Sequence, residues 1–176
     1  MKNNILVLLI MSFLMKSTEI EISISEQKLF LLDNKSVVKT YLISSSKYGE
    51  GSKANSFKTP LGKHVIKRKI GKDTPLGARF IGRIFSGEIY PIHDSDPVFV
   101  EDDIVQSRIL WLDGLEDGIN KGEGVDSYSR YIYIHGTPEE WLLGTKASKG
   151  CIRMSNKDVI ELFNLVEEGI PVTINK

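Results

Sequence analysis

Short runs of alternating apolar and polar residues most constrain what this chain can fold into. Residues 20–25 read IEISIS, a period of two that is typical of a strand with one buried face. Turn-forming residues at 26–27 and 33–35 separate this run from two further strand-like runs at 28–32 and 37–44. Connections this short join antiparallel neighbours, so the N-terminal part of the chain predicts a β-meander.

A Thr-Pro-Leu-Gly sequence occurs twice, at 59–62 and at 74–77, and suits a type II turn in both places. The first turn leads into a strand-like run at 64–69, where His64 is expected to be structural or to line a groove. The basic residues 68–72 are interpreted as a solvated loop, with contact to a substrate carboxylate as the alternative. A further short strand is predicted at 109–112.

A single helix is predicted near the C-terminus, where apolar residues recur at helical spacing. These residues are Val159, Ile160, Leu162, Phe163 and Val166. Ser155 and Asp158 resemble a capping box, Gly169 is expected to end the helix, and a last strand follows at 172–174. A chain of 176 residues is long enough for one domain with a real core. We therefore predict a mainly β fold, a sandwich or barrel-like meander with one principal helix.

Residues 1–19 differ from the rest of the chain. A lysine precedes an apolar run from Ile5 to Met15, which resembles the first two regions of a secretory signal. The run is shorter than the roughly 20 residues of a transmembrane helix. Cleavage is expected near Ser17 or Thr18, although no Ala-x-Ala site marks it; a buried first strand or helix and an uncleaved anchor are the alternatives. The prediction is a signal peptide or anchor over 1–19, a domain over 20–176, and a location in the periplasm or cell envelope.

Charge and composition narrow the function classes. The 23 basic and 23 acidic residues balance, so neither a nucleic-acid-binding face nor long-range attraction to anionic polymers is predicted. His93, Asp94 and Asp96 are too few for a zinc site, and residues 113–124 fail the spacing of a calcium loop. We predict no metal and no cofactor. The single cysteine excludes an intramolecular disulfide, and in an exported protein it indicates a reactive thiol.

That cysteine, Cys151, lies 16 residues (151 − 135) after a histidine that ends a strand-like run at 131–134. Because Gly136 breaks the run, His135 is expected at the mouth of a strand, where a scaffold can hold it rigidly. Cys151 itself follows a short polar loop, 148–150. A buried cysteine and a structural histidine are the commoner uses of these residues. The polar neighbours of Cys151 argue against that alternative.

The residue types predict thiol chemistry. A thiolate is the reactive species, and His135 can take the thiol proton while the carbonyl of Gly136 holds the other ring nitrogen. Arg153 and Lys149 add positive charge, which is expected to lower the pKa of the thiol. The N–H groups of Gly150 and Cys151 are candidates for an oxyanion hole.

These motifs resemble a known family. HGT, a gap and then SKGCIRM resemble the signature of the L,D-transpeptidases of the YkuD type. Residues 22–46 and the stretch KTPLGKHVI at 58–66 resemble the opening strands of that family and its Thr-Pro-x-Gly turn. The resemblance covers about residues 20–176. Lys149 stands where the family usually has histidine. This difference concerns the part that the usual histidine has in positioning the substrate, and it does not concern the thiol–imidazole pair.

The resemblance implies a YkuD-type catalytic domain acting on peptidoglycan stem peptides. Cys151 would attack the carbonyl of the third residue of a donor tetrapeptide, and terminal D-Ala would leave. His135 would act first as base and then as acid. An amine from a second stem or from a lipoprotein would resolve the thioester, whereas water would make the enzyme an L,D-carboxypeptidase. Ser148, Lys149 and Arg153 are assigned to site organisation or substrate binding; Arg153 suits a substrate carboxylate, with a structural ion pair as the alternative. Carbapenem inhibitors are expected to acylate the same thiol.

Three other classes of protein are alternatives to this interpretation. A papain-like protease has its cysteine before its histidine, the reverse of the order here, and a caspase-like histidine lies about 50 residues upstream. A non-enzymatic wall-binding module is the alternative from another class, and it predicts that the thiol never acylates. A redox thiol would not need His135.

Overall fold

The computed structural model describes residues 17–176, which form ten strands and one α-helix. The strands are β1 (Thr18–Ser23), β2 (Lys28–Asp33), β3 (Ser36–Ser44), β4 (Gly62–Ile70), β5 (Ala78–Ile81), β6 (Ile84–Ile89), β7 (Val105–Gly114), β8 (Tyr133–Gly136), β9 (Ile152–Met154) and β10 (Pro171–Asn175). The helix is α1 (Asn156–Leu165), and a 3₁₀ turn covers Glu140–Leu142. The mainly β fold with one principal helix is confirmed.

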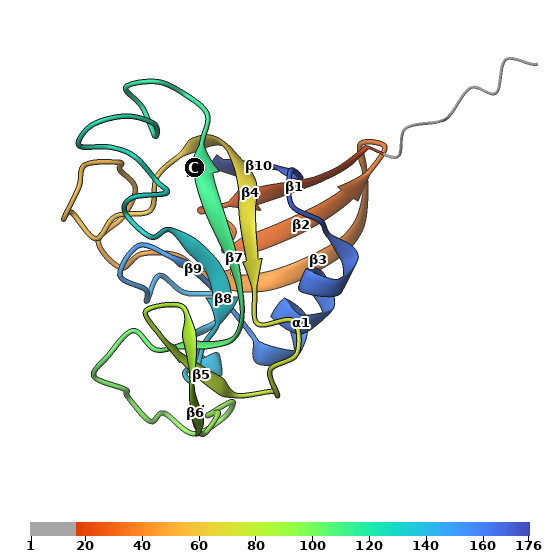
Figure 1. Cartoon of the computed structure of the whole chain (residues 1–176), viewed down its shortest axis with the longest axis vertical. Coiled ribbons are helices and arrows are strands. Elements are labelled where there is room, and N and C mark those ends of the chain that lie inside the picture. Colours follow the sequence, from red (N-terminus) through yellow and green to blue (C-terminus); the bar gives the residue numbers. More distant parts are fainter. Residues whose placement is uncertain (1–16) are drawn as a thin grey trace, which may run out of the picture.

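The sheet closes on itself. Its order is β4-β10-β1-β2-β3-β9-β8-β7-β5-β6, and β4 pairs with β7 as well as with β10. This second pairing joins β4 to β7 and completes a barrel, from which the β5–β6 hairpin extends (Figure 1). Closure leaves few unpaired strand edges, which is how many antiparallel folds avoid edge-to-edge association. The predicted meander β1-β2-β3 forms one part of the wall.

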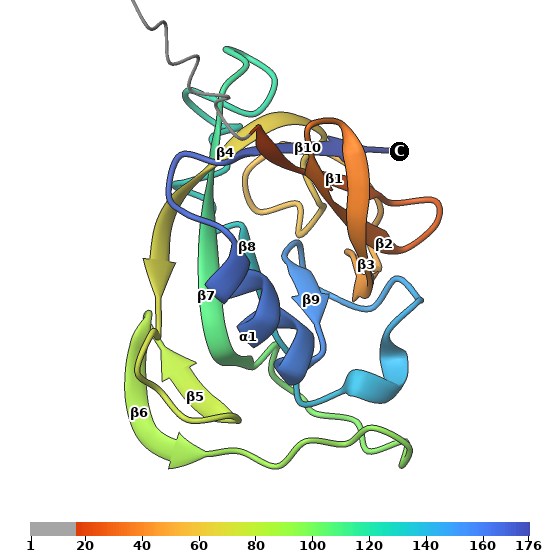
Figure 2. The same ribbon diagram turned by 90° about the vertical axis from the view of Figure 1, so that its right-hand side faces the viewer.

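The helix lies between the two sides of the barrel, with β4 and β7 on one side of it and β3 and β9 on the other (Figure 2). Its buried residues Val159, Leu162 and Phe163 join the main core, which also contains Ile134 and Ile152 of the strands. Each fully buried side chain of this size contributes roughly 1.5–3 kcal/mol relative to exposure. The predicted helix therefore fills the barrel interior.

The capping prediction at the start of α1 is confirmed, because the Ser155 hydroxyl accepts a hydrogen bond of 3.0 Å from the N–H of Asp158. The end of α1 differs from the prediction. The helix stops at Leu165, before Gly169, because Val166 adopts an extended backbone with φ −118°.

The strand predictions missed β5, β6 and β9. The last of these is only three residues long, too short for a pattern of period two. The strand expected at 131–134 is displaced to Tyr133–Gly136, since Tyr131 has a left-handed φ of 58° that a strand residue does not adopt. This displacement matters for the site, because it places His135 inside β8.

The predicted signal peptide or anchor lies mostly in residues 1–16, which are outside the described residues. Strand β1 begins at Thr18, and Thr18 and Glu19 pair with Asp33 and Leu32 of β2. No helix within residues 17–176 combines the length and the apolar character needed to cross a membrane.

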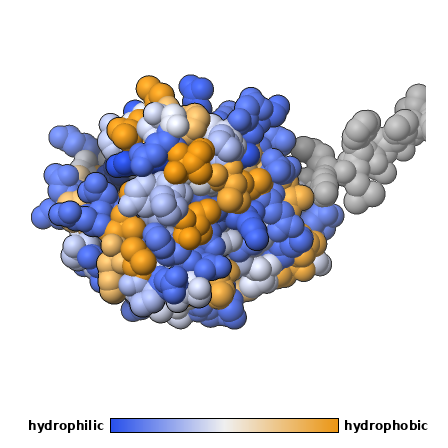
Figure 3. All heavy atoms as spheres, turned by 90° about the horizontal axis from the view of Figure 1, so that it is seen from below, coloured by the Kyte–Doolittle hydropathy of each residue, from blue (hydrophilic) through white to orange (hydrophobic). Residues whose placement is uncertain are grey.

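The surface around the β5–β6 hairpin is mixed. In the view from below, hydrophobic groups alternate with hydrophilic ones (Figure 3). Exposed large hydrophobic residues of the hairpin include Ile81, Ile84 and Ile89. Scattered apolar residues of this kind are normal on a protein surface.

Candidate active site

The candidate site lies on the outer face of the barrel, where β7, β8 and β9 are neighbours. Side chains alternate along a strand, so Ile134 and Ile152 enter the main core while Tyr133 lies on the opposite face. Tyr133 belongs to a second, smaller cluster with Ile109 and Trp111, against which Cys151 packs. The thiol is therefore separated from the main core by the sheet.

Cys151 and His135 are brought together by the parallel pairing of β8 and β9. Ile134 pairs with Ile152 and His135 with Arg153, so Cys151 lies beside Tyr133, two residues before His135 on the same face. Strands about 4.8 Å apart and a two-residue rise of about 6.6 Å put the two positions about 8 Å apart. An imidazole and a thiol side chain can together span that separation.

His135 is completely buried within β8, so the prediction that it lies at the mouth of a strand is wrong. Its Nδ1 lies 2.8 Å from the carbonyl oxygen of Gly136, the contact that a tautomer-orienting role requires. Its Nε2 is buried and has no hydrogen-bond partner among residues 17–176. Burial lowers the pKa of His135, which favours the neutral ring. Since Nδ1–H donates to the carbonyl, the unpartnered Nε2 carries the lone pair.

Gly136 is required here by close packing. A Cβ at this position would lie 2.4 Å from Oδ1 of Asn156. Asn156 in turn donates from Nδ2 to the carbonyl of Thr137 at 2.8 Å and accepts from Ser107 Oγ at 2.6 Å. The first residue of α1 thus fixes the backbone that follows His135, a role that the sequence analysis did not identify.

The thiol of Cys151 is partly buried and is held by backbone groups. Its Sγ accepts from the N–H of Tyr133 and donates to the carbonyl of Tyr131, both at 3.3 Å. Burial raises the pKa of Cys151 to about 12, and the negative charge of Asp103 acts in the same direction. The charge of Arg153 lowers the thiol pKa as predicted, but burial outweighs it, so the pKa is raised overall.

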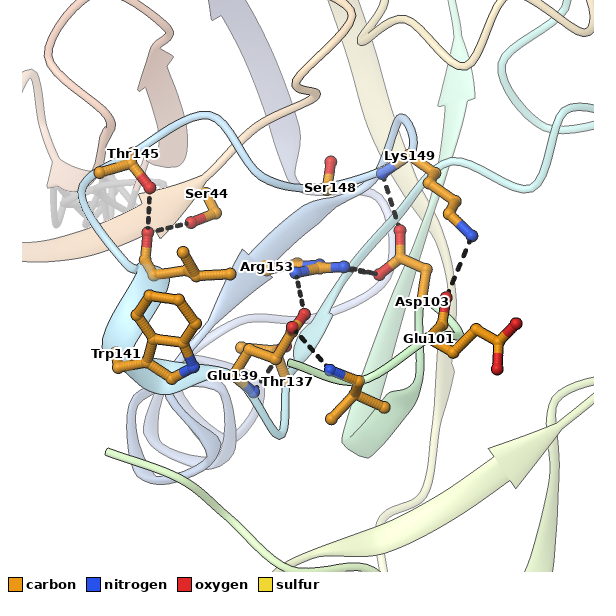
Figure 4. A network of polar contacts seen from close by, with 12 residues as sticks. Ser44, Glu101, Asp103, Thr137, Glu139, Trp141, Thr145, Ser148, Lys149 and Arg153 are labelled. Carbon is orange, nitrogen blue, oxygen red and sulfur yellow. Dashed lines mark hydrogen bonds and ion pairs between the residues drawn. The ribbon is translucent and has the colours of Figure 1, made fainter. Parts of the chain in front are cut away.

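The guanidinium of Arg153 forms ion pairs with two carboxylates (Figure 4). Its Nε and Nη2 each lie 2.7 Å from Oδ1 of Asp103, and its Nη1 lies 2.8 Å from Oε2 of Glu139. The side chain is almost fully buried, with 5% exposed. Breaking a buried bridge of this kind leaves an uncompensated charge, which costs roughly 3–5 kcal/mol. Arg153 therefore organises the site, and its guanidinium is already paired.

Ser148 holds the loop before Cys151. Its hydroxyl donates to the carbonyl of Cys151 at 2.6 Å and accepts from the N–H of Gly150 at 3.2 Å. Thr59, from the first Thr-Pro-Leu-Gly turn, donates to the carbonyl of Gly150 at 3.0 Å. Gly150 has φ +126°, a conformation that L side chains rarely adopt. In this structure the N–H of Gly150 donates to the hydroxyl of Ser148. To act in an oxyanion hole, this N–H would have to leave Ser148 and donate to the substrate oxygen instead.

Lys149 is exposed beside the thiol loop. Its backbone N–H donates to Oδ2 of Asp103 at 2.8 Å, and its Nζ lies 3.5 Å from the carbonyl of Glu101. The position that is usually histidine in the family therefore carries a cation at the rim of the site. The same Asp103 binds both Lys149 and Arg153 (Figure 4).

Residues 91–104, which we call the strap, lie against the site. Besides Asp103, the N–H of Val100 donates to Oε1 of Glu139 at 3.0 Å, and the N–H of His93 donates to the carbonyl of Pro138 at 2.7 Å. Phe99 packs edge-on against Trp141, with ring centroids 4.8 Å apart. The strap was not assigned to the site from sequence. Within residues 17–176, no group of three or more His, Cys, Asp or Glu side chains is arranged to hold a metal ion.

Comparison with known proteins identifies the family. The family model described as the L,D-transpeptidase catalytic domain, YkuD, matches residues 17–174. The chain belongs to this family. The YkuD protein of Bacillus subtilis (strain 168) is 55% identical over 51 residues, which are 28% of this chain and 31% of that relative. The match thus spans about a third of that relative's length.

Solved structures share the fold. An L,D-transpeptidase from Mycobacterium smegmatis is 17% identical, with a TM-score of 0.57 over 92% of this chain and 59% of that chain. L,D-transpeptidase 3 from Mycobacterium tuberculosis, in complex with a faropenem-derived adduct, is also 17% identical, with a TM-score of 0.56 over 92% of this chain and 61% of that one. The chain therefore carries the L,D-transpeptidase catalytic domain and its barrel.

Sequence reasoning missed Asp103 and Glu139, the partners of Arg153, and the half-buried Arg130. Asp103 is 50 residues from Arg153, and nothing local marks an acidic residue in a loop as its partner. Arg130 immediately precedes the strand-like run that leads to His135. Its position directly before that run is the sequence feature that could have marked Arg130 as a site residue.

Proposed function

We propose that this protein is a cysteine-dependent L,D-transpeptidase that acts on peptidoglycan stem peptides through a thioester on Cys151. The observation that carries the proposal is Nε2 of His135, a buried nitrogen without a partner in the described part of the chain, on the same sheet face as the thiol. A buried polar atom without a partner costs roughly 1–3 kcal/mol. That cost is understandable where the nitrogen serves as a proton acceptor.

The first half of the reaction forms the thioester. The neutral ring of His135 takes the thiol proton on Nε2 as Sγ attacks the carbonyl carbon of the third residue of a donor tetrapeptide. Since the thiol now donates to Tyr131, it must rotate toward the ring before transfer. Nε2–H then protonates the amine of the leaving D-Ala as the C–N bond breaks.

The second half transfers the acyl group. An acceptor amine, from another stem peptide or from a lipoprotein, attacks the thioester carbon and gives its proton to His135. The proton returns to sulfur as the C–S bond breaks. With water as acceptor the same steps give a tripeptide, which is the L,D-carboxypeptidase alternative. The raised pKa of Cys151 supports a mechanism in which proton transfer accompanies attack, because a resting thiolate is disfavoured.

We also propose that the protein works in the periplasm or cell envelope, where peptidoglycan is found. The support is the apolar run Ile5–Met15 near the N-terminus. Fractionation of cells that make the full chain tests this proposal. Recovery of the protein with cytoplasmic markers alone would contradict it.

The decisive experiment incubates the protein with purified muropeptides that carry tetrapeptide stems and resolves the products by mass spectrometry. Dimers linked between two third residues support transpeptidation, whereas tripeptides alone support the carboxypeptidase. Intact mass after exposure to a carbapenem should show a covalent adduct on wild-type protein and none on Cys151→Ala.

Cys151→Ala also separates the enzyme from the alternative of a wall-binding module. Loss of product by this variant, with the fold retained by circular dichroism, supports the enzyme. Binding of both proteins to sacculi without any product or adduct supports the binding module and overturns the proposal.

A further inference from the structure

Lys149 lines two cavities. The first, of about 260 Å³, is lined by the strap together with Glu139 and Arg153. The second, of about 240 Å³, is lined by Phe57, Arg130, Tyr131 and Lys149 among others, and we call it the Arg130 cavity. The two cavities differ in charge. The first combines acidic and basic side chains, whereas the charged residues lining the second are all cations.

Arg130 has no acidic partner among the described residues. Its Nη2 donates to the carbonyl of Lys58 at 2.7 Å, and its Nη1 lies 3.4 Å from the carbonyl of Gly51. These two carbonyls orient the guanidinium but leave its full charge uncompensated. Burial lowers the pKa of Arg130, in keeping with a cation that is half-buried without a counter-ion. Lys149 lines the same cavity, and within residues 17–176 its Nζ likewise has a backbone carbonyl, that of Glu101, as its partner.

The Arg130 cavity is next to the thiol. Tyr131 lines the cavity, and its carbonyl accepts the hydrogen bond from Sγ of Cys151. Lys149 lies two residues before Cys151, and Gly150 between them approaches the cavity wall: a Cβ there would lie 3.6 Å from both Ile132 Cδ1 and the carbonyl of Phe57. An anion in this cavity would therefore lie close to a peptide carbonyl held at the sulfur.

The proposed reaction supplies such an anion. A donor that loses its terminal residue carries a carboxylate one residue beyond the bond that breaks, so a site that selects this bond needs a group to bind that carboxylate. Arg153, assigned to this task from sequence, is buried between Asp103 and Glu139. We propose that Arg130, together with Lys149, binds the terminal carboxylate of the donor peptide. This inference rests on the proposed function and specifies its substrate.

Arg83 is the other arginine near the thiol whose guanidinium lacks an acidic partner among residues 17–176. It lies over the rings of Trp111 and Tyr131, 4.8 and 4.9 Å from their centroids, and its Nη1 is 3.4 Å from the hydroxyl of Tyr133. These aromatic contacts already hold the guanidinium, and Arg83 lines neither cavity beside Lys149. We therefore assign the carboxylate to Arg130 and keep Arg83 as the rival in the test.

The test compares two donors that differ in one group: a tetrapeptide with a free terminal carboxylate and the same peptide with a terminal carboxamide. Wild-type protein should prefer the acid by about 10- to 100-fold in kcat/KM, the range for a hydrogen-bonded charged group. Arg130→Gln should bring this ratio close to one, chiefly by slowing the acid. Lys149→Gln, at an exposed position, should reduce the ratio about two- to fivefold.

Lys53→Gln is the matched control, because it removes an exposed cation from the same loop as Lys58 without touching the cavity. It should leave the ratio as in wild type. Arg130→Lys, which keeps the charge but loses the planar fork, should give an intermediate ratio if the carboxylate is bound by both nitrogens.

The outcomes separate the two levels of inference. If wild-type protein converts neither donor, the proposed function fails. If it converts both donors equally, or if Arg130→Gln remains folded and keeps the wild-type ratio, only the carboxylate site is overturned. A ratio that collapses in Arg83→Gln and not in Arg130→Gln would move the site to the β5–β6 hairpin and contradict our assignment.

Discussion

Two histidines of this protein have nearly the same surroundings and differ at one nitrogen. His64 on β4 and His135 on β8 are both buried, and burial lowers the pKa of each. In both, Nδ1 contacts a nearby backbone carbonyl, that of Gly62 at 2.9 Å and that of Gly136 at 2.8 Å. In His64, however, Nε2 is 2.9 Å from the hydroxyl of Ser127, whereas Nε2 of His135 has no partner.

The difference separates a structural histidine from a candidate base. In His64, Nδ1 contacts the carbonyl of Gly62 within β4, and Nε2 joins β4 to Ser127 in the segment before β8, so the ring has no nitrogen left for a substrate. His135 has one nitrogen fixed and one available, beside the thiol. Four predictions test this contrast, beginning with the largest expected effect.

Replacing His135 should abolish acyl transfer, whereas replacing His64 should not. His135→Gln is expected to lower kcat/KM for the tetrapeptide donor by at least about 100-fold, since a positioned acid–base group contributes roughly 10²–10⁴-fold. His64→Gln should stay within about threefold of wild type. Product analysis by mass spectrometry measures both. Equal losses in two folded variants would show that the open nitrogen has no special role.

Stability should show the reverse order. His64→Ala removes two hydrogen bonds and leaves Ser127 unpartnered, so it is expected to lower the free energy of unfolding by about 2–4 kcal/mol. His135→Ala removes one hydrogen bond and also a buried nitrogen that had no partner, so its loss should be smaller by about 1–2 kcal/mol. Urea titration measures the difference. Strict additivity between His64→Ala and Ser127→Ala would contradict the His64–Ser127 contact.

Acid should destabilise the protein through both rings. Because the pKa of each histidine is lowered by folding, the unfolded chain binds protons below about pH 6.5 that the native state does not, and stability falls as pH drops. We expect a loss of stability between pH 6.5 and 5.5 to which each ring contributes, with a ceiling of about 1 kcal/mol per ring. Each His→Gln variant should remove the contribution of its own ring to the change in the free energy of unfolding with pH. If both variants keep the wild-type pH dependence, the prediction is refuted.

The smallest effect is expected in alkali. The pKa of Cys151 is raised to about 12, so the unfolded thiol ionises first and stability should fall as pH rises above about 8.5. The expected loss is about 1 kcal/mol between pH 8 and 9.5, and Cys151→Ser should not show it. Alkylation by iodoacetamide should likewise be slower than for an unburied thiol at pH 8. Rapid alkylation at pH 7 would indicate a thiolate and contradict the raised pKa.

The sequence by itself determined the local features. Alternation of isoleucines specified β1, apolar spacing and Ser155 specified α1, and the segment from His135 to Arg153 specified the family. Each of these signals lies within one element or one short stretch, where periodicity and turn chemistry act directly. Gly136 could be selected from sequence because it follows the histidine, but its packing against Asn156 could not.

Only the tertiary structure decided how the site is charged and which groups remain available. Arg153 is paired because the neighbouring strands β7, β8 and β9 bring Asp103 and Glu139 to it, and the thiol pKa rises because burial removes the thiol from water. The same fold gives Nε2 of His64 a hydrogen-bond partner and, among the described residues, leaves Nε2 of His135 without one. Burial and ion pairing depend on contacts between residues distant in the chain, so no local pattern contains them.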